Sequence, residues 1–241
     1  ASLLALGGGG MNIGMRLGAW SGGKPTARDY VQDGLLVHFD GIENVGLGLP
    51  HDSSATKWNN LTDSFVPSQI GALTFGADYG VFAGSQSVNT GIWWDHASCT
   101  VETMFSFDNF NSNMCVLSST ATGGFSVQYE NGNKFFAVRD SQSNSYKFVY
   151  KTWSENEFNR LVCTAGDGFI KSYTGSVIDS TIPFSSIQKP SRGFLYIGSS
   201  SSGASQFLFG KIKFVRIYNR VLSADEIAAN YEIDKARFNL T

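Results

Sequence analysis

The sequence has few charged residues and no long apolar run. Only 16% of its 241 residues are charged, and 18 Lys and Arg against 20 Asp and Glu leave a net charge of -2. A chain so balanced has no basic surface for duplex DNA, so we expect no nucleic-acid partner. So little charge beside 14% aromatic residues also excludes a charged disordered tail and disfavours a surface helix bundle. No apolar run approaches the roughly 20 residues that cross a bilayer, and no membrane span is expected.

Cysteine is scarce and odd in number. Cys99, Cys115 and Cys163 each stand in an apolar, strand-like context, where a free cysteine serves as a small hydrophobic residue. We favour this interpretation over a disulfide or a reactive thiol. The apolar stretch 1–6 is too short for a signal-peptide core and lacks a basic start, so a removed signal peptide and none at all stay equally open.

Glycine and aromatic residues are abundant instead, with 27 Gly, 19 Phe, 9 Tyr and 5 Trp. Short apolar or alternating runs separated by turn residues indicate about a dozen strands and an all-β, two-sheet antiparallel sandwich. The predicted strands are 34–40, 72–75, 79–83, 100–107, 114–118, 124–129, 134–140, 146–150, 159–165, 168–173, 193–198 and 207–218.

Two turns and one helix have specific signals. Asn131-Gly132 and Asp167-Gly168, each between apolar runs, predict β-hairpins. Ser223 followed by Glu226 forms a capping box and predicts a short helix near the C-terminus.

Residues 1–24 differ from the rest, which we expect to form the sandwich (25–241). The segment holds the glycine run 7–10 and the Gly22-Gly23 pair, and ordering four glycines carries a large entropic cost. A flexible tail is one interpretation. We favour the other, an arm that docks on another chain through its large apolar residues, namely Leu3, Leu4, Leu6, Met11, Ile13 and Trp20.

The segments 33–41 and 209–227 resemble the opening and closing strands of laminin-G-like domains, which belong to the concanavalin A-like lectin/glucanase superfamily. Trp58-Asn59-Asn60-Leu61 resembles the polar loop that follows the first strand, so the resemblance covers roughly residues 30–236. It implies a jelly roll, and similar domains occur in secreted bacterial proteins, adhesins and proteins of gut bacteria and their phages. Lys211 and Lys213 stand where many relatives carry acidic residues.

No cofactor is expected, although some relatives bind calcium and the low-ranked candidates here are Asp40, Asp52 and Asp63. For each of these we prefer a turn or cap role.

Catalytic signatures are missing from the sequence. Glycosidases of the resembled superfamily use a Glu-x-Asp-x-x-Glu strand, whereas Glu232-Ile-Asp234 is followed by Arg237 in a segment with helical character. No hydrolase elbow, zinc-protease helix or phosphate loop is present. We therefore expect a protein that is not an enzyme.

Sugar binding requires an aromatic ring for stacking and polar groups that hold hydroxyls. In an extended segment, adjacent Trp93 and Trp94 point to opposite faces. The candidates, each weighed against plain packing or turn roles, are Trp93, Trp94, Asp95, Asn109, Asn111, Tyr129 and Asn131.

The sequence thus favours a carbohydrate-binding or adhesive module on a virion, such as a phage head or fibre decoration, or on a bacterial surface. Its partners would be a surface polysaccharide and, through residues 1–24, other chains of the assembly; a homo-oligomer stays open. The alternatives are a purely structural decoration protein with no glycan ligand and, ranked last, a glucanase-like hydrolase.

Overall fold

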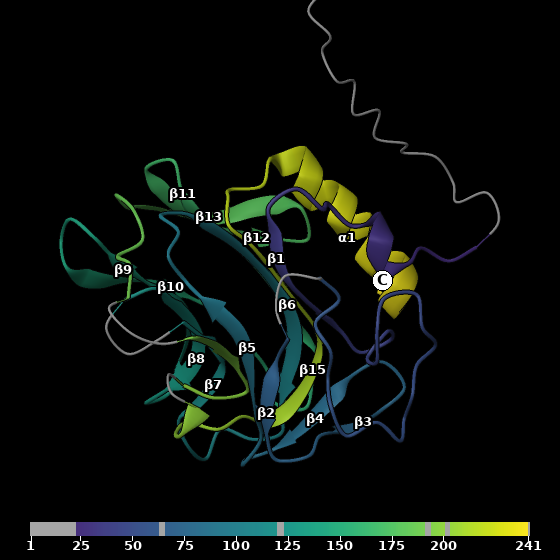
Figure 1. Cartoon of the computed structure of the whole chain (residues 1–241). Coiled ribbons are helices and arrows are strands. Elements are labelled where there is room, and N and C mark those ends of the chain that lie inside the picture. Colours follow the sequence, from purple (N-terminus) through teal and green to yellow (C-terminus); the bar gives the residue numbers. More distant parts are fainter. Residues whose placement is uncertain (1–22, 63–65, 120–122, 191–193, 201–202, 241) are drawn as a thin grey trace, which may run out of the picture.

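Two antiparallel sheets face each other across one core in the computed structural model, which describes residues 23–62, 66–119, 123–190, 194–200 and 203–240 (Figure 1). This is the expected jelly-roll sandwich with one C-terminal helix. The predicted arm 1–24 lies outside the described residues except for Gly23 and Lys24, and so do all six of its apolar docking residues.

Within the described residues, one sheet, sheet A, has eight strands and the other, sheet B, has seven. Sheet A runs in the order β13 (Val177–Pro183), β12 (Phe169–Thr174), β11 (Asn159–Gly166), β6 (Cys99–Phe107), β15 (Phe209–Tyr218), β4 (Gly80–Ala83) and β3 (Thr74–Phe75), and β1 (Leu35–Asp40) also pairs with β15. Sheet B runs in the order β10 (Ser145–Tyr150), β9 (Asn133–Asp140), β8 (Phe125–Glu130), β7 (Met114–Ser118), β14 (Phe194–Ile197), β5 (Ser87–Trp93) and β2 (Ser68–Ile70).

The predicted strands are confirmed, with bounds that differ by at most two residues. Three further strands, β2, β5 and β13, were not predicted from the sequence. Strand β5 contains Asn89 and Gly91, which are poor strand formers, and β13 is an edge strand that ends at Pro183.

Both predicted hairpins are confirmed. Asn131 and Gly132 connect β8 to β9 with φ angles of 49° and 83°, and Asp167 and Gly168 connect β11 to β12 with 53° and 83°. Two successive left-handed residues make a turn whose twist matches the strands on either side, which explains why Asx-Gly pairs occur there.

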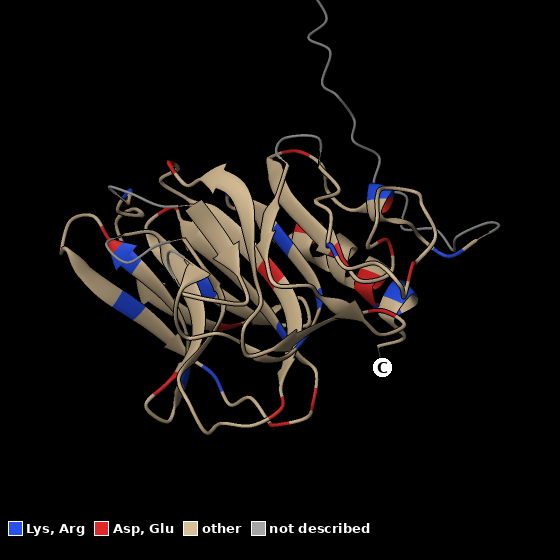
Figure 2. Cartoon of the chain, turned by 60° about the horizontal axis from the view of Figure 1, so that its bottom comes forward, with Lys and Arg blue, Asp and Glu red and all other residues tan. Residues whose placement is uncertain are grey.

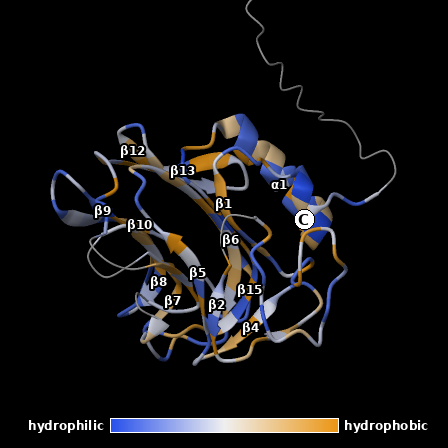
Figure 3. Cartoon of the chain, in the orientation of Figure 1, coloured by the Kyte–Doolittle hydropathy of each residue, from blue (hydrophilic) through white to orange (hydrophobic). Residues whose placement is uncertain are grey.

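The capping box is also confirmed, and it begins helix α1 (Ala224–Phe238). The Ser223 side chain accepts from the Glu226 backbone N–H, and the Glu226 carboxylate accepts from the Ser223 N–H. A short 3-10 helix, η1 (Ala27–Asp29), precedes β1 and has a second capping box at Thr26. Helix α1 alternates hydrophilic and hydrophobic segments, as expected of a helix with one covered face (Figure 3).

Strand β6 is buried on both of its faces. Val101, Phe105 and Phe107 belong to the core between the sheets, whereas Met104, on the opposite face, packs with Phe214 and Phe238 beneath helix α1. The three cysteines are free and buried, as expected, and burial raises the pKa of each thiol. They therefore act as packing residues.

Candidate functional site

The outward face of sheet A is covered by helix α1 and by residues 25–31 (Figure 1). Tyr30 Oη donates to Asp234 Oδ1 at 2.9 Å, and Arg237 Nη1 donates to the Pro25 carbonyl at 2.9 Å. Beneath these contacts, Glu102 of β6 and Arg216 of β15 are fully buried. A ligand cannot reach this part of the sheet without displacing the helix.

Glu102 and Asp234 are two buried carboxylates that share one guanidinium group, that of Arg216. Both bond to Arg216: Nε donates to Glu102 Oε2 at 2.8 Å, and Nη2 donates to both Asp234 oxygens at 2.8 and 3.0 Å. Burial opposes the charge of Arg216, yet the two carboxylates raise its pKa well above the ordinary value. Glycosidases place their two acids in an open cleft that admits substrate, whereas both of these carboxylates are buried.

Of the three acidic residues considered for calcium, Asp40 and Asp52 form hydrogen bonds within the protein. Asp40 accepts from the Ile42 backbone N–H at 2.7 Å and from Arg237 Nη2 at 2.8 Å. Burial alone would raise its pKa, but the interactions with His38 and Arg237 lower it to about 2. Asp52 Oδ1 accepts a hydrogen bond from the Ser54 backbone N–H at 2.8 Å. Asp63 lies outside the described residues. Among the described residues, no group of three or more His, Cys, Asp or Glu side chains is placed to hold a metal ion.

The adjacent tryptophans of the 93–95 segment point to opposite sides. Trp94 is fully buried, meets Phe125 edge to face and donates its Nε1–H to the His96 carbonyl at 3.1 Å, so it is unavailable to a ligand. Trp93 is 44% exposed on the outward face of sheet B. Asp95 is exposed and forms a long ion pair, 3.9 Å, with the exposed Lys189.

Trp93 has an aromatic partner that the sequence did not reveal. Phe194 of β14 pairs with Trp93, is 38% exposed, and meets it edge to face with ring centroids 5.9 Å apart. We call Trp93 and Phe194 the Trp93 platform. Its two residues are far apart in the chain, and only the pairing of β5 with β14 brings them together.

Polar groups lie next to the Trp93 platform on the same face. Tyr196 Oη accepts a hydrogen bond from Asn89 Nδ2 at 3.4 Å, and Tyr196 and Asn89 are paired across β14 and β5. Between Asn89 and Trp93, β5 contains Gly91 at φ 79°, where the register shifts. A bulge at a glycine re-aims the neighbouring side chains, and no side chain projects at Gly91 itself.

The remaining candidates lie at the other end of sheet B. Tyr129 is paired with Met114 at one end of β7, whereas Ser118 at the other end of β7 is paired with Tyr196. Tyr129 packs against Phe110 with tilted rings 4.6 Å apart and donates to its carbonyl at 2.9 Å. The Asn131 backbone N–H donates to Asn113 Oδ1 at 2.9 Å. Asn109 accepts from the backbone of the exposed Asn111 at 3.1 Å, as in an ordinary turn. The predicted set is therefore split between two separate regions.

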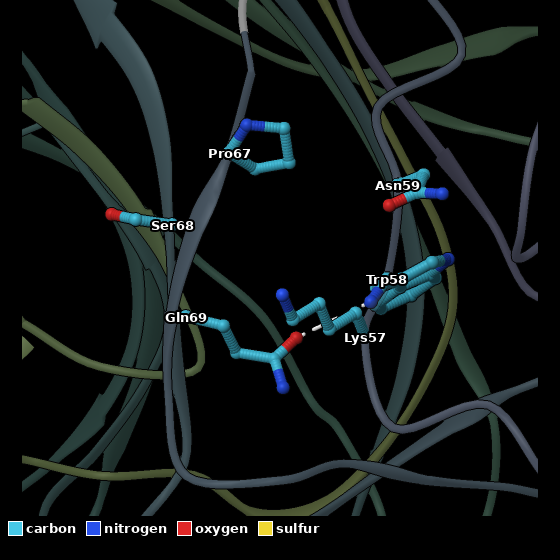
Figure 4. Close-up of a pocket in the computed structure, with 6 residues that line it drawn as sticks. All are labelled: Lys57, Trp58, Asn59, Pro67, Ser68 and Gln69. Carbon is cyan, nitrogen blue, oxygen red and sulfur yellow. Dashed lines mark hydrogen bonds between the residues drawn. The ribbon is translucent and has the colours of Figure 1, made fainter.

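Two cavities in the described part of the chain were not predicted from the sequence. One, of about 330 Å³, is lined by Lys57, Trp58, Asn59, Pro67, Ser68 and Gln69 (Figure 4). The Trp58 indole is buried and donates to the Asp40 carbonyl, so its ring is part of the core.

The larger cavity, about 590 Å³, lies beside the C-terminal end of α1. Lys151 and Asp179 on its wall pair with each other at 2.8 Å, and Arg160 pairs with Asp234 at 3.0 Å. These charges are already matched within the protein. Charges of both signs are likewise scattered over the described part of the chain (Figure 2).

The comparisons agree with this architecture. The family model described as the concanavalin A-like lectin/glucanases superfamily matches residues 75–228, which is more than half of the chain. The chain belongs to this superfamily. No curated protein sequence matches it.

Solved structures show the same fold at low sequence identity. Domain 4 of AbnA, a GH43 extracellular arabinanase from Geobacillus stearothermophilus solved with arabinotriose, is 14% identical with a TM-score of 0.62, covering 82% of this chain and 98% of that one. The receptor-binding domain of botulinum neurotoxin C/D mosaic serotype is 14% identical with a TM-score of 0.58, covering 83% of this chain and 51% of that one. The present chain thus spans about half the length of the toxin domain.

No helix in the described residues is both long enough and apolar enough to cross a membrane.

Proposed function

We propose that this protein is a non-enzymatic carbohydrate-binding module that binds glycan on the outward face of sheet B. One observation carries the proposal: Trp93 is exposed against Phe194 on the sheet face that helix α1 does not cover. An exposed indole offers a flat apolar surface to the apolar face of a sugar ring. The neighbouring Asn89, Tyr196 and Asp95 supply donors and acceptors for hydroxyl groups.

The relatives support the class of ligand. Domain 4 of AbnA was solved in complex with arabinotriose. Cell entry of botulinum neurotoxin type C, whose structure matches this chain with a TM-score of 0.59, is dependent upon interaction with two ganglioside molecules. The burial of Glu102 and Asp234 around Arg216 supports a role without hydrolysis, because a substrate has no access to that pair.

The test is glycan binding by the intact chain and by two matched variants. We expect Trp93→Ala to weaken binding about tenfold or more, since loss of a stacked ring removes at least ~1.4 kcal/mol. Phe169→Ala removes an aromatic ring of similar exposure from sheet A and should leave the affinity unchanged. If the intact chain binds nothing on a glycan array at millimolar ligand, or if both variants bind equally, the proposal fails.

The setting we propose is a virion or bacterial surface, with residues 1–24 as the docking arm. The glycine-rich, apolar sequence of the arm motivates this part. Deletion of residues 1–22 should abolish incorporation into the assembly while glycan affinity stays unchanged. Incorporation without the arm would refute the docking role, and incorporation that needs the arm in a protein without glycan affinity would favour a purely structural decoration protein.

A further inference from the structure

A second group of aromatic side chains lies on strands β9 and β10, away from the residues discussed so far. Phe148 and Tyr150 of β10 are stacked, with ring centroids 5.9 Å apart and an interplanar angle of 21°. Phe135 of β9 is paired with Tyr150 on the same face, meets both rings edge to face at 5.1 and 6.2 Å, and is itself buried. Tyr150 is 63% exposed. We call Phe148 and Tyr150 the Tyr150 platform.

Strand register places the Tyr150 platform and the Trp93 platform on the same face of sheet B. Paired residues of antiparallel strands project to the same side, and so do residues two apart along a strand. Phe148 pairs with Ala137, Ala137 with Ser126, Ser126 with Ser118, Ser118 with Tyr196, and Tyr196 lies two residues beyond Phe194. This unbroken row of pairs links one platform to the other.

The row also gives the distance between the platforms. Strand β10 is four strands from β14 and five from β5 in the sheet order, and neighbouring strands lie about 4.8 Å apart, so the platforms are about 20 Å apart across the sheet. The row residues between them, Ser118, Ser126 and Ala137, are small and buried, so they add no stacking surface between the platforms. Two stacking surfaces at this separation exceed the reach of a single sugar ring.

We propose that the ligand is a long linear polysaccharide that engages both platforms at once, each platform stacking on a different sugar of the same chain. This inference rests on the proposed function and specifies its ligand as a segment of a chain, not a terminal sugar. Once one platform holds the chain, the other meets it at a high effective concentration, so a chain long enough to bridge them binds far more tightly than a short one.

The test compares trisaccharides with octasaccharides of arabinan, xylan, mixed-linkage β-glucan and chitin by titration calorimetry. The intact chain should bind the octasaccharide of its preferred glycan at least about tenfold more tightly than the trisaccharide. Tyr150→Ala should reduce octasaccharide affinity to the trisaccharide level and leave trisaccharide binding by the Trp93 platform intact. Phe169→Ala is the control, and thermal unfolding of each variant checks its fold.

The outcomes separate the two proposals. Equal affinity for both lengths, or an octasaccharide affinity that Tyr150→Ala does not change, overturns the two-platform inference while carbohydrate binding stands. No binding by the intact chain, either to these glycans or on a glycan array at millimolar ligand, overturns both. An octasaccharide advantage that is lost in Tyr150→Ala and retained in Phe169→Ala supports both.

Discussion

Arg216 on the last strand and Asp234 on helix α1 form a two-point ion pair, with Nη2 at 2.8 and 3.0 Å from the two carboxylate oxygens and neither side chain exposed. Asn230, one turn earlier on the helix, donates to Glu102 and to Tyr218 Oη. The helix is therefore fixed on sheet A by directional polar bonds in addition to its apolar contacts. Such bonds allow one orientation of the helix.

Asp234→Asn should be strongly destabilising. Removing one partner of a buried ion pair leaves an uncompensated charge and costs about 3–5 kcal/mol. The free energy of unfolding, measured in urea, gives this loss directly. Glu232→Gln on the same helix is the matched control, because its ion pair with Lys235 is exposed and such pairs are worth at most about 1 kcal/mol. Equal effects of the two substitutions would contradict the role assigned to Arg216 and Asp234.

Gly198→Ala should be far more harmful than Gly132→Ala, although both glycines have nearly the same positive φ, 80° and 83°. A Cβ at Gly198 would clash with the buried Phe82 ring, whereas one at Gly132 meets nothing within 4 Å. The left-handed backbone costs each variant about 1–2 kcal/mol, and overpacking adds about 1–3 kcal/mol at Gly198 only. Urea unfolding of both variants measures the difference, and equal losses would show that the Phe82 ring yields without cost.

Glu226 should contribute stability that is lost in acid. The hydrogen bonds from Arg220 lower the pKa of Glu226 from 4.5 to about 2. Because the folded-state pKa lies below the unfolded value, this contribution is complete above pH 4.5 and disappears as the pH falls towards 2. Glu226→Gln should therefore have a lower melting temperature than the native chain at pH 7, and the gap should close at pH 2. A gap that persists unchanged at pH 2 would contradict the charge-based origin.

Substitution of Trp94 should lower the stability of the fold, whereas substitution of Trp93 should affect mainly glycan binding. Trp94→Ala removes a fully buried indole and should cost about 3–5 kcal/mol of unfolding free energy. Trp93→Ala should leave stability within about 1 kcal/mol, because nearly half of that side chain is already exposed. Urea unfolding of both variants checks that Trp94 lies in the core and Trp93 on the exposed face. A larger loss of unfolding free energy for Trp93→Ala than for Trp94→Ala would contradict this placement.

Local patterns in the sequence were sufficient for most of the strands. Turn chemistry at Asn131-Gly132 and the capping box at Ser223 act over a few residues, and these elements were predicted. Strand β5 was missed because Asn89 and Gly91 are poor strand formers, and the bulge at Gly91 depends on pairing with β14 far away in the chain. Its last residue, Trp93, was nevertheless selected from its side-by-side position with Trp94.

The long-range partners could not be predicted from sequence spacing. Phe194 follows Trp93 only after eight intervening strands, and nothing in its surroundings distinguishes it from the other phenylalanines of the chain. Glu102 and Arg216 alternate as ordinary outward-facing polar residues, which in most sheets meet water. Only the position of helix α1 turns them into buried partners, and no local pattern specifies where a terminal helix packs.

The contact between Arg237 and the Pro25 carbonyl joins the first described residues to the final helix, on the side of the sandwich opposite to both aromatic platforms. A tether introduced before residue 25 and one introduced after residue 240 would therefore leave the molecule from the same side. Immobilised by either end on a sensor chip or a bead, the domain would present the outward face of sheet B to the solution.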